Sequence, residues 1–378
     1  FSSLNNFRVS KKLEYLILSD TDVASLDGIQ VFNESLTTLI MAGCELSGPF
    51  PESILSLSAL KHLDLAYNFL SGSISDGIDE FQDLRTLGLN HNFFNGQLPS
   101  TLGNLQRLSQ VQISFNILSG TLPTEMNDMY SLTFVTLNDQ IQGMGDAQVG
   151  GINGPLIDFA ALQFLFHLDF SNNRLTGSVP PTFLASLLHG FGYSTVIDLR
   201  SNRLSGELPS TLARFDNVLP YLADNQIESI PQELCQASDW LFGQVGEFGC
   251  NALLCPPGTF NEFGRQLSAG FPCWQCRAGK TAPYYGSKSC ILDTVAQSSS
   301  AWETKDTISL AHVSPGVERL STNDEDYQRS YWSNELEEQD ETGDAFDLQL
   351  SALSSGTREA FGKTVSLLLV LPTAFMLL

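Results

Sequence analysis

The chain has 378 residues, of which 42% are hydrophobic and 16% are charged, and its formal net charge at pH 7 is −23. The hydrophobic content is sufficient for a large folded core, whereas the strong negative charge repels polyanions. Nucleic acid is therefore excluded as an expected partner.

A leucine-rich unit recurs nine times between Leu16 and Asn225, at a spacing of about 24 residues. In each unit a stretch such as residues 60–65 places leucines on one face of a strand and polar side chains on the other. One such strand cannot bury its apolar face alone, so we expect the units to stack into a parallel sheet over one continuous core. Each stretch ends at an anchor position, and the anchors are expected to form a buried hydrogen-bonded ladder. The nine anchors are Thr21, Cys44, Asn68, Asn92, Asn116, Gln140, Asn173, Asn202 and Asn225.

Residues 118–123 and 204–209 both read Leu-Ser-Gly-x-Leu-Pro, and they resemble plant-type leucine-rich repeats. This resemblance extends over roughly residues 13–234. It implies an α/β repeat solenoid, a right-handed horseshoe with a parallel sheet on the concave face and short strands and 3₁₀ turns on the convex side. It also implies an extracellular, receptor-like recognition protein without a kinase. Insertions at residues 143–151 and 183–194 are expected to form loops on the rim or convex side.

Polar side chains of the strands should form columns on an exposed concave face. The middle of this face is polar and uncharged, with apolar or aromatic groups toward both ends, which suits an extended protein, peptide or glycan ligand better than a buried small molecule. An alternative is that contact occurs on a rim or on an N-terminal part outside the sequence. The candidate ligand-binding strip comprises His62, Asp64, Asn90, Gln110, Gln112, Phe134, His167, Asp169 and Arg200.

Two His-x-Asp pairs, His62 with Asp64 and His167 with Asp169, are the strongest catalytic candidates. Alternation places each His and Asp on the same face, where they could bind a metal or act as a base and its orienting group. However, no nucleophile or third ligand accompanies them, and four units of ~4.8 Å separate the pairs by roughly 19 Å. We therefore predict no catalytic residues, no metal, no cofactor and no enzymatic activity.

Seven cysteines are unevenly distributed. Cys44 occupies an anchor position, where we expect a small buried side chain. The other six follow the last repeat and predict a cystine-stapled module that covers the open end of the solenoid. Its segments at residues 255–260, 273–276 and 285–290 resemble ephrin-receptor-like cysteine-rich modules. The predicted disulfide cysteines are Cys235, Cys250, Cys255, Cys273, Cys276 and Cys290.

Six cysteines allow 15 pairings, and the sequence does not choose among the pairings. A four-thiolate zinc site is the alternative for Cys250, Cys255, Cys273 and Cys276. Disulfides are favoured because a small Gly/Pro-rich module behind a surface-type solenoid is typical of an oxidising compartment.

The region beyond the cysteines is strongly acidic. Residues 318–347 hold 11 acidic side chains against Arg319 and Arg329, which predicts a disordered stalk. A solvated amphipathic helix over residues 334–350 is the alternative.

The last 14 residues, 365–378, are apolar but short of the ~20 needed to span a membrane. Three small residues from Ser354 and a polar spacer precede them, as in a glycosylphosphatidylinositol attachment signal with Ser354 as the acceptor. A retained single-pass helix starting near Ala360 is the alternative. The sequon at Asn33 adds a candidate glycosylation site, and the chain begins at Phe1 as if a signal peptide and an N-terminal cap were missing.

Together these features predict a protein of the cell surface or wall, reached through the secretory pathway. The leading hypothesis is a membrane-tethered recognition protein, receptor-like or co-receptor-like, which would signal through a transmembrane partner. The alternatives are a secreted or wall-associated inhibitor of an extracellular hydrolase, and an adhesive or structural surface protein. The predicted domains are the solenoid at residues 1–234, the cysteine-rich cap at 235–292, the acidic stalk at 293–353 and the attachment signal or anchor at 354–378.

Overall fold

The computed structural model describes residues 13–21, 25–143, 148–188 and 194–296, which belong to one compact unit. The predicted stalk beyond residue 296 and the attachment signal with Ser354 lie outside these described residues. Within them, no helix combines the length and the apolar character that a membrane crossing requires.

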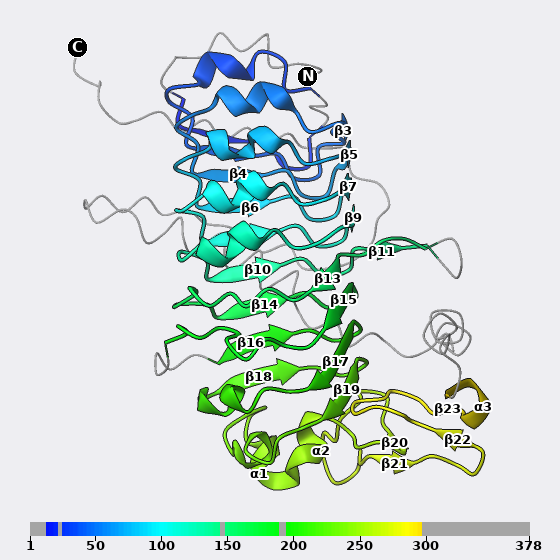
Figure 1. Ribbon diagram of the computed structural model, residues 1–378. Helices are drawn as coiled ribbons and strands as arrows, with labels where there is room; N and C mark the ends of the chain where they lie inside the picture. Colours follow the sequence, from blue (N-terminus) through cyan, green and yellow to red (C-terminus); the bar gives the residue numbers. More distant parts are fainter. Residues whose placement is uncertain (1–12, 22–24, 144–147, 189–193, 297–378) are drawn as a thin grey trace. The chain divides into compact units, whose positions relative to one another are not determined.

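The predicted parallel sheet is confirmed and contains nine strands, one from each repeat (Figure 1). Neighbouring strands pair in register, so that Leu63 lies between Leu39 and Leu87, and His62 lies between Thr38 and Thr86. The predicted side-chain columns are therefore also confirmed. In spatial order the strands are β1 (Tyr15–Ile17), β2 (Thr38–Ile40), β4 (His62–Asp64), β6 (Thr86–Gly88), β8 (Gln110–Gln112), β10 (Phe134–Thr136), β14 (His167–Asp169), β16 (Thr195–Asp198) and β18 (Val218–Tyr221).

The outer side carries short strands and 3₁₀ turns, as expected from the Leu-Ser-Gly-x-Leu-Pro segments. Prolines such as Pro99 and Pro123 precede 3₁₀ turns, because their fixed φ suits a helix start. The 3₁₀ turns are η2 (Ile29–Phe32), η3 (Glu52–Ser56), η4 (Asp76–Glu80), η5 (Ser100–Asn104), η6 (Thr124–Asp128), η8 (Ser210–Arg214) and η9 (Leu234–Gln236).

The outer strands form two parallel sheets of four strands rather than one. The first sheet contains β3 (Ser47–Gly48), β5 (Phe69–Gly72), β7 (Phe93–Gly96) and β9 (Ile117–Leu118). The second contains β13 (Asn153–Pro155), β15 (Arg174–Gly177), β17 (Arg203–Glu207) and β19 (Gln226–Ser229).

The insertion that was expected to be a loop is partly an antiparallel hairpin of β11 (Ile141–Gln142) and β12 (Val149–Gly150). It projects between the two outer sheets (Figure 1). Gly150 has φ 78°, and a Cβ atom there would lie 2.2 Å from the Gln140 carbonyl oxygen, so only glycine fits. In the second lengthened unit, the Leu184 N–H donates to the Asp158 carbonyl at 2.7 Å, which holds the described part of that insertion against the preceding repeat.

The anchor ladder is present inside the solenoid. Asn116 is fully buried, and its Nδ2 donates to the carbonyl oxygens of Leu89 and Ile113, both at 3.0 Å. Its Oδ1 accepts the N–H of Phe94 at 2.9 Å, so one amide links its own repeat to the preceding one through two of the three bonds. Gln140 donates to the Ile113 carbonyl at 2.7 Å and thus replaces asparagine with a longer amide.

Cys44 is also fully buried, as predicted, and its Sγ donates to the Leu18 carbonyl at 2.8 Å. Its backbone N–H donates to Asn68 Oδ1 at 3.0 Å. The thiol therefore replaces an anchor amide as the donor to the preceding repeat, and the backbone N–H of Cys44 bonds the anchor of the following repeat.

The cysteine-rich module carries three disulfides, Cys235–Cys250, Cys255–Cys273 and Cys276–Cys290. The four cysteines considered for zinc are all consumed by these bonds. The module's elements are α1 (Gln244–Phe248), α2 (Cys250–Leu253), β20 (Thr259–Phe260), β21 (Trp274–Gln275), β22 (Lys280–Thr281), β23 (Ile291–Leu292) and α3 (Asp293–Ala296).

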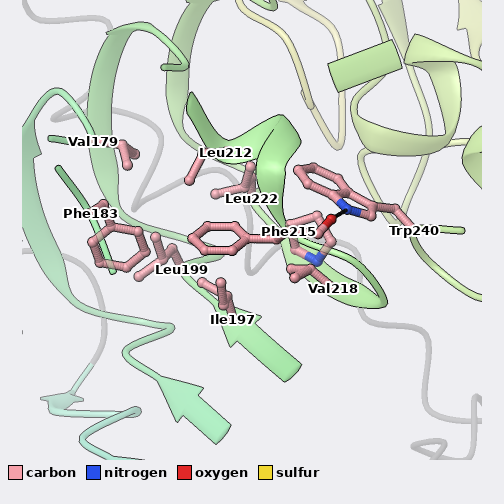
Figure 2. Close-up of a pocket in the computed structure, with 10 residues that line it drawn as sticks. Val179, Phe183, Ile197, Leu199, Leu212, Phe215, Val218, Leu222 and Trp240 are labelled. Carbon is pink, nitrogen blue, oxygen red and sulfur yellow. Dashed lines mark hydrogen bonds between the residues drawn. The ribbon is translucent and has the colours of Figure 1, made fainter. Parts of the chain in front are cut away.

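This module covers the end of the solenoid by backbone pairing and by core packing. Asp224 N–H donates to the Gly286 carbonyl at 2.9 Å, and Tyr285 N–H donates to the Ile227 carbonyl at 3.0 Å. Trp240 is 2% exposed, and its Nε1 donates to the Phe215 carbonyl at 2.7 Å (Figure 2). Figure 2 also shows a small cavity lined by apolar residues, among them Phe215 and Trp240. A cavity of this kind is a packing gap in the core rather than a polar ligand site.

Candidate functional site

The middle of the candidate concave strip is closed. Gln110 is 3% exposed, and Gln112 and Asn90 are each 6% exposed, although we expected these side chains to face solvent. The expectation was wrong because neighbouring strands of a parallel sheet are only about 4.8 Å apart, so long side chains in one column cover those in the next. The middle of the strip is therefore a packed polar surface.

At the N-terminal end of the strip, His62 and Asp64 are half-buried and already engaged. His62 Nδ1 lies 2.9 Å from Thr86 Oγ1, and burial, followed by the charges of Arg85 and Lys61, lowers the histidine pKa to about 4. Asp64 accepts the Ala66 N–H at 2.9 Å, and burial raises its pKa to about 6.

Asp169 and Asp198 repeat the role of Asp64 in two adjacent strands. Asp169 accepts the Ser171 N–H at 2.9 Å, and Asp198 accepts the Arg200 N–H at 3.0 Å. The Arg200 guanidinium also binds Asp198 bidentately, with Nε 2.9 Å from each carboxylate oxygen. Asp169, which pairs in register with Asp198, has its pKa raised to about 7 by burial and then by the charge of that second carboxylate.

Side chains at the C-terminal end of the sheet form a group that is open to solvent mainly at Arg200, since Phe134 and Asp198 are buried. The Phe134 ring stacks on His167 with centroids 4.5 Å apart, and Arg200, whose side chain is 47% exposed, lies 5.1 Å from the centroid of the Tyr221 ring. The cap adds Arg265, 5.5 Å from the same ring. We call the whole set the concave cluster: Phe134, His167, Asp169, Asp198, Arg200, Tyr221 and Arg265.

Three members of the concave cluster were absent from the predicted strip. Asp198 and Tyr221 share a column with Asp169 but were not selected, whereas Arg265 belongs to the cap, whose disulfide pairing the sequence left open. Gly264 brings Arg265 to the sheet, because its φ is 68° and a Cβ there would lie 2.4 Å from Ala223 Cβ. A glycine beside a lone arginine gives no signal of this contact in the sequence.

The two His-x-Asp pairs are not brought together, since β6, β8 and β10 lie between β4 and β14. Within the described ranges, no group of three or more His, Cys, Asp and Glu side chains is arranged to hold a metal ion. Asn33, the candidate glycosylation site, is exposed at the end of η2.

A second surface, which the sequence reasoning missed, lies where each concave strand turns toward the outer side. The residue before every anchor has positive φ, and at six repeats it is Asp20, Gly43, Asp139, Asn172, Ser201 or Asp224. The other three repeats have Tyr67, His91 and Phe115, with φ of 56°, 54° and 56°. We call these three residues the aromatic spine.

The aromatic spine conflicts with local backbone preference. Left-handed backbone costs a bulky residue about 1–2 kcal/mol, whereas Gly, Asn and Asp tolerate it. Stacking offsets part of this cost. The centroid of the His91 ring lies 4.3 Å from those of Tyr67 and Phe115, with an interplanar angle of 11° in each case. Such pairs contribute about 0.5–1.5 kcal/mol. The rings are thus close to neutral for stability, and the two bulky residues in left-handed backbone, Tyr67 and Phe115, make this surface a candidate functional one.

Comparison with known families agrees with the repeat architecture. The Leucine Rich Repeat model matches residues 35–57, 59–81, 83–105, 164–185 and 195–215. The fold is therefore a leucine-rich-repeat solenoid with a disulfide-rich module at its C-terminal end. No curated protein sequence matches the chain significantly.

Several solved structures with a similar chain path come from plants. The Arabidopsis receptor kinase HAESA, in complex with the peptide hormone IDA and the co-receptor SERK1, is 26% identical over 56% of this chain and 33% of its own, with a TM-score of 0.46. The plant peptide hormone receptor RGFR1, in complex with RGF2, is 24% identical over 56% and 36%, with a TM-score of 0.47. A plant ice-binding protein is 23% identical over 56% and 73%, with a TM-score of 0.43. The chain spans about a third of the length of the two receptors.

Proposed function

We propose that this protein is an extracellular, membrane-tethered recognition protein, receptor-like or co-receptor-like, that binds a protein, peptide or glycan at the concave cluster. The single observation that carries the proposal is the change along the concave face. Its middle is sealed by buried Thr and Gln side chains, whereas its C-terminal end offers aromatic rings, two guanidinium groups and two carboxylates. Rigid aromatic and arginine side chains are the groups that dominate binding energy at interfaces.

The concave cluster is held in place before any ligand arrives. Asp198 fixes the Arg200 guanidinium, both Arg200 and Arg265 lie against the Tyr221 ring, and His167 is stacked on Phe134. Preorganised side chains lose little conformational entropy on binding, which favours affinity.

The proposal includes the absence of enzymatic activity. A carboxylate oxygen of each candidate aspartate accepts the N–H of the residue two positions later. The candidate histidines contact Thr86 or Phe134. These contacts give both pairs a structural role.

Tethering rests on the sequence of the tail, and a transmembrane co-receptor would then transmit any signal. The three disulfides are consistent with an extracellular or cell-surface protein. Phosphatidylinositol-specific phospholipase C should release the full chain from intact cells if Ser354 carries a lipid anchor, whereas a peptide span would retain the chain.

Site-specific photocrosslinking tests the binding surface. The full chain is expressed on cells with a photoreactive amino acid in place of His167, and a matched variant carries it at the exposed Ser53 of η3. We expect a covalent adduct from position 167 only, reduced at least about fivefold by Arg200→Ala. Equal adducts from both positions would contradict concave recognition, and loss of a secreted hydrolase's activity in the adduct would instead favour the inhibitor alternative.

A further inference from the structure

The three repeats of the aromatic spine carry no charged residue next to it, whereas the flanking repeats place Glu45 and Asp139 at the corresponding positions. Residues 67–75, 91–101 and 115–123 contain no Asp, Glu, Lys or Arg, although the whole chain has a net charge of −23. Phe69 and Phe93 are 54% and 43% exposed on β5 and β7, two residues beyond members of the spine. We call the spine together with these two phenylalanines the lateral patch.

The two columns of the lateral patch present different parts of their rings. In the spine, close stacking covers both faces of His91 and one face each of Tyr67 and Phe115, so ring edges dominate what remains. Phe69 and Phe93 are also near-parallel at 11°, but their centroids are 6.3 Å apart and both residues are strongly exposed, so their faces are less covered than those of the spine. Aromatic pairs prefer an edge against a face, because ring edges are electropositive and faces electronegative.

From this geometry we infer that the lateral patch is a self-association surface that binds the same patch of a second copy of this chain. A two-fold axis running between the two columns, along the solenoid, brings the spine of each copy onto the open phenylalanines of the other. Such a contact is isologous, and each copy supplies both edges and faces.

Charge selects a second copy over other occupants. Two chains of net charge −23 repel one another over most of their surfaces, and the uncharged patch is where they approach at the lowest electrostatic cost. A basic protein would be drawn to the acidic surface instead. A neutral glycan prefers open ring faces, which within the patch only Phe69 and Phe93 provide, so it would not engage the stacked spine.

The proposal is tested by crosslinking across the expected contact. Two differently tagged full chains, one with His91→Cys and the other with Phe93→Cys, are expressed together on cells and mildly oxidised. The matched control replaces Phe93→Cys by Tyr130→Cys, since Tyr130 is 55% exposed but lies beyond η6, outside the patch. Surface amounts of each chain are measured to normalise the yields.

We expect a disulfide-linked dimer from the 91/93 pair at least about tenfold above the 91/130 pair, which corresponds to about 1.4 kcal/mol. Adding Phe69→Ser to both chains should remove the excess, and raising the salt concentration should increase it by screening repulsion. Equal yields from the two pairs, or an excess that survives Phe69→Ser, would overturn the proposal.

A second measurement needs no introduced cysteine. An amine-reactive crosslinker is applied to cells that express the unaltered chain, the Phe69→Ser chain or the Tyr130→Ser chain. Dimers should be lost only with Phe69→Ser. Adducts of another mass in place of dimers would assign the lateral patch to a different protein. Retardation of the chain by soluble neutral glucan in native electrophoresis, lost with Phe69→Ser and seen without dimers, would assign the patch to a glycan. Either result contradicts self-association.

Discussion

The two halves of the solenoid share one core but differ in which face they open. In the repeats before the β11–β12 hairpin, the concave face is sealed and the lateral face exposes aromatic rings. In the repeats after it, the concave face carries the charged cluster, and the lateral positions are Asn172, Ser201 and Asp224, which suit left-handed backbone. The hairpin marks the change because it separates the two outer sheets. Repetition thus fixes the scaffold, while each half is free to carry a different surface.

The largest effect is expected at the cap, on which the C-terminal half depends. Trp240→Ala removes a buried ring and the hydrogen bond to the Phe215 carbonyl, so it should lower the free energy of unfolding by about 3–5 kcal/mol. Chemical denaturation followed by circular dichroism measures this. The control is Trp274→Ala, whose ring is 53% exposed and whose loss should change stability by less than about 0.5 kcal/mol.

The next largest effect, the loss of stability on removing an anchor amide, should be the same in both halves, because the anchor ladder has the same hydrogen bonds in each. Asn92→Ala and Asn202→Ala each leave the N–H and carbonyl groups of neighbouring repeats without partners, at a cost of about 2–3 kcal/mol. Denaturant midpoints compare the two variants with the exposed Asn95→Ala. A difference of more than about 1.5 kcal/mol between Asn92→Ala and Asn202→Ala would show that the halves differ in their interior as well.

A smaller, pH-dependent effect is expected, and among the aspartates it should be largest in the C-terminal half. Folding raises the pKa of Asp169 from 3.8 to about 7, so the folded state holds the proton more tightly, and this carboxyl lowers stability as pH rises from about 4 to 7. Asp169→Asn keeps an acceptor for the Ser171 N–H and should therefore stabilise the protein by about 1–2 kcal/mol at pH 8 and hardly at all at pH 4.

Melting temperatures across this pH range test the expectation, with the exposed Asp239→Asn as the charge-matched control. His62 acts in the opposite sense, because its lowered pKa makes the folded state lose stability as pH falls from 6.5 toward 4. A stabilisation by Asp169→Asn that does not change with pH would exclude the buried carboxyl as its cause.

The smallest effect is expected at the aromatic spine. His91→Asn relieves the strain of left-handed backbone and loses two stacking contacts, so stability should change by no more than about 1 kcal/mol. Asn172→His makes the reverse substitution in the other half. It should lower the free energy of unfolding by about 1–2 kcal/mol, because the neighbouring repeats have Asp139 and Ser201 there and offer no rings for stacking. A loss above about 2 kcal/mol in His91→Asn would give the spine a structural role and weaken the case for a binding surface.

The sequence predicted the scaffold well because its repeat period places leucines, anchors and turn residues at fixed intervals. The register of Phe134 with His167 and of Asp169 with Asp198 followed from aligning the repeat motif across the two insertions. Exposure did not follow, because the burial of Gln110 depends on how side chains of adjacent strands cover each other. Arg265 was also beyond reach, since only the folding of the cap carries it to Tyr221.

The aromatic spine could have been found in the sequence by looking for positions that depart from the repeat pattern. Tyr67, His91 and Phe115 occupy the position that elsewhere holds Gly, Ser, Asn or Asp, and three successive departures at one position are visible by eye. Periodicity was used to locate the core, whereas these residues are informative because they break the pattern.

The bond from Asp224 to Gly286 has a consequence for how such chains change in length. In the repeats, the N–H of the residue before the anchor, as at Phe115 and Asn172, donates to a carbonyl of the following repeat. The cap supplies the equivalent acceptor for Asp224, so it closes the solenoid in the way that one more coil would. A terminus of that kind fits behind any number of coils. Duplication or deletion of whole units upstream would then lengthen or shorten the protein without requiring a new ending.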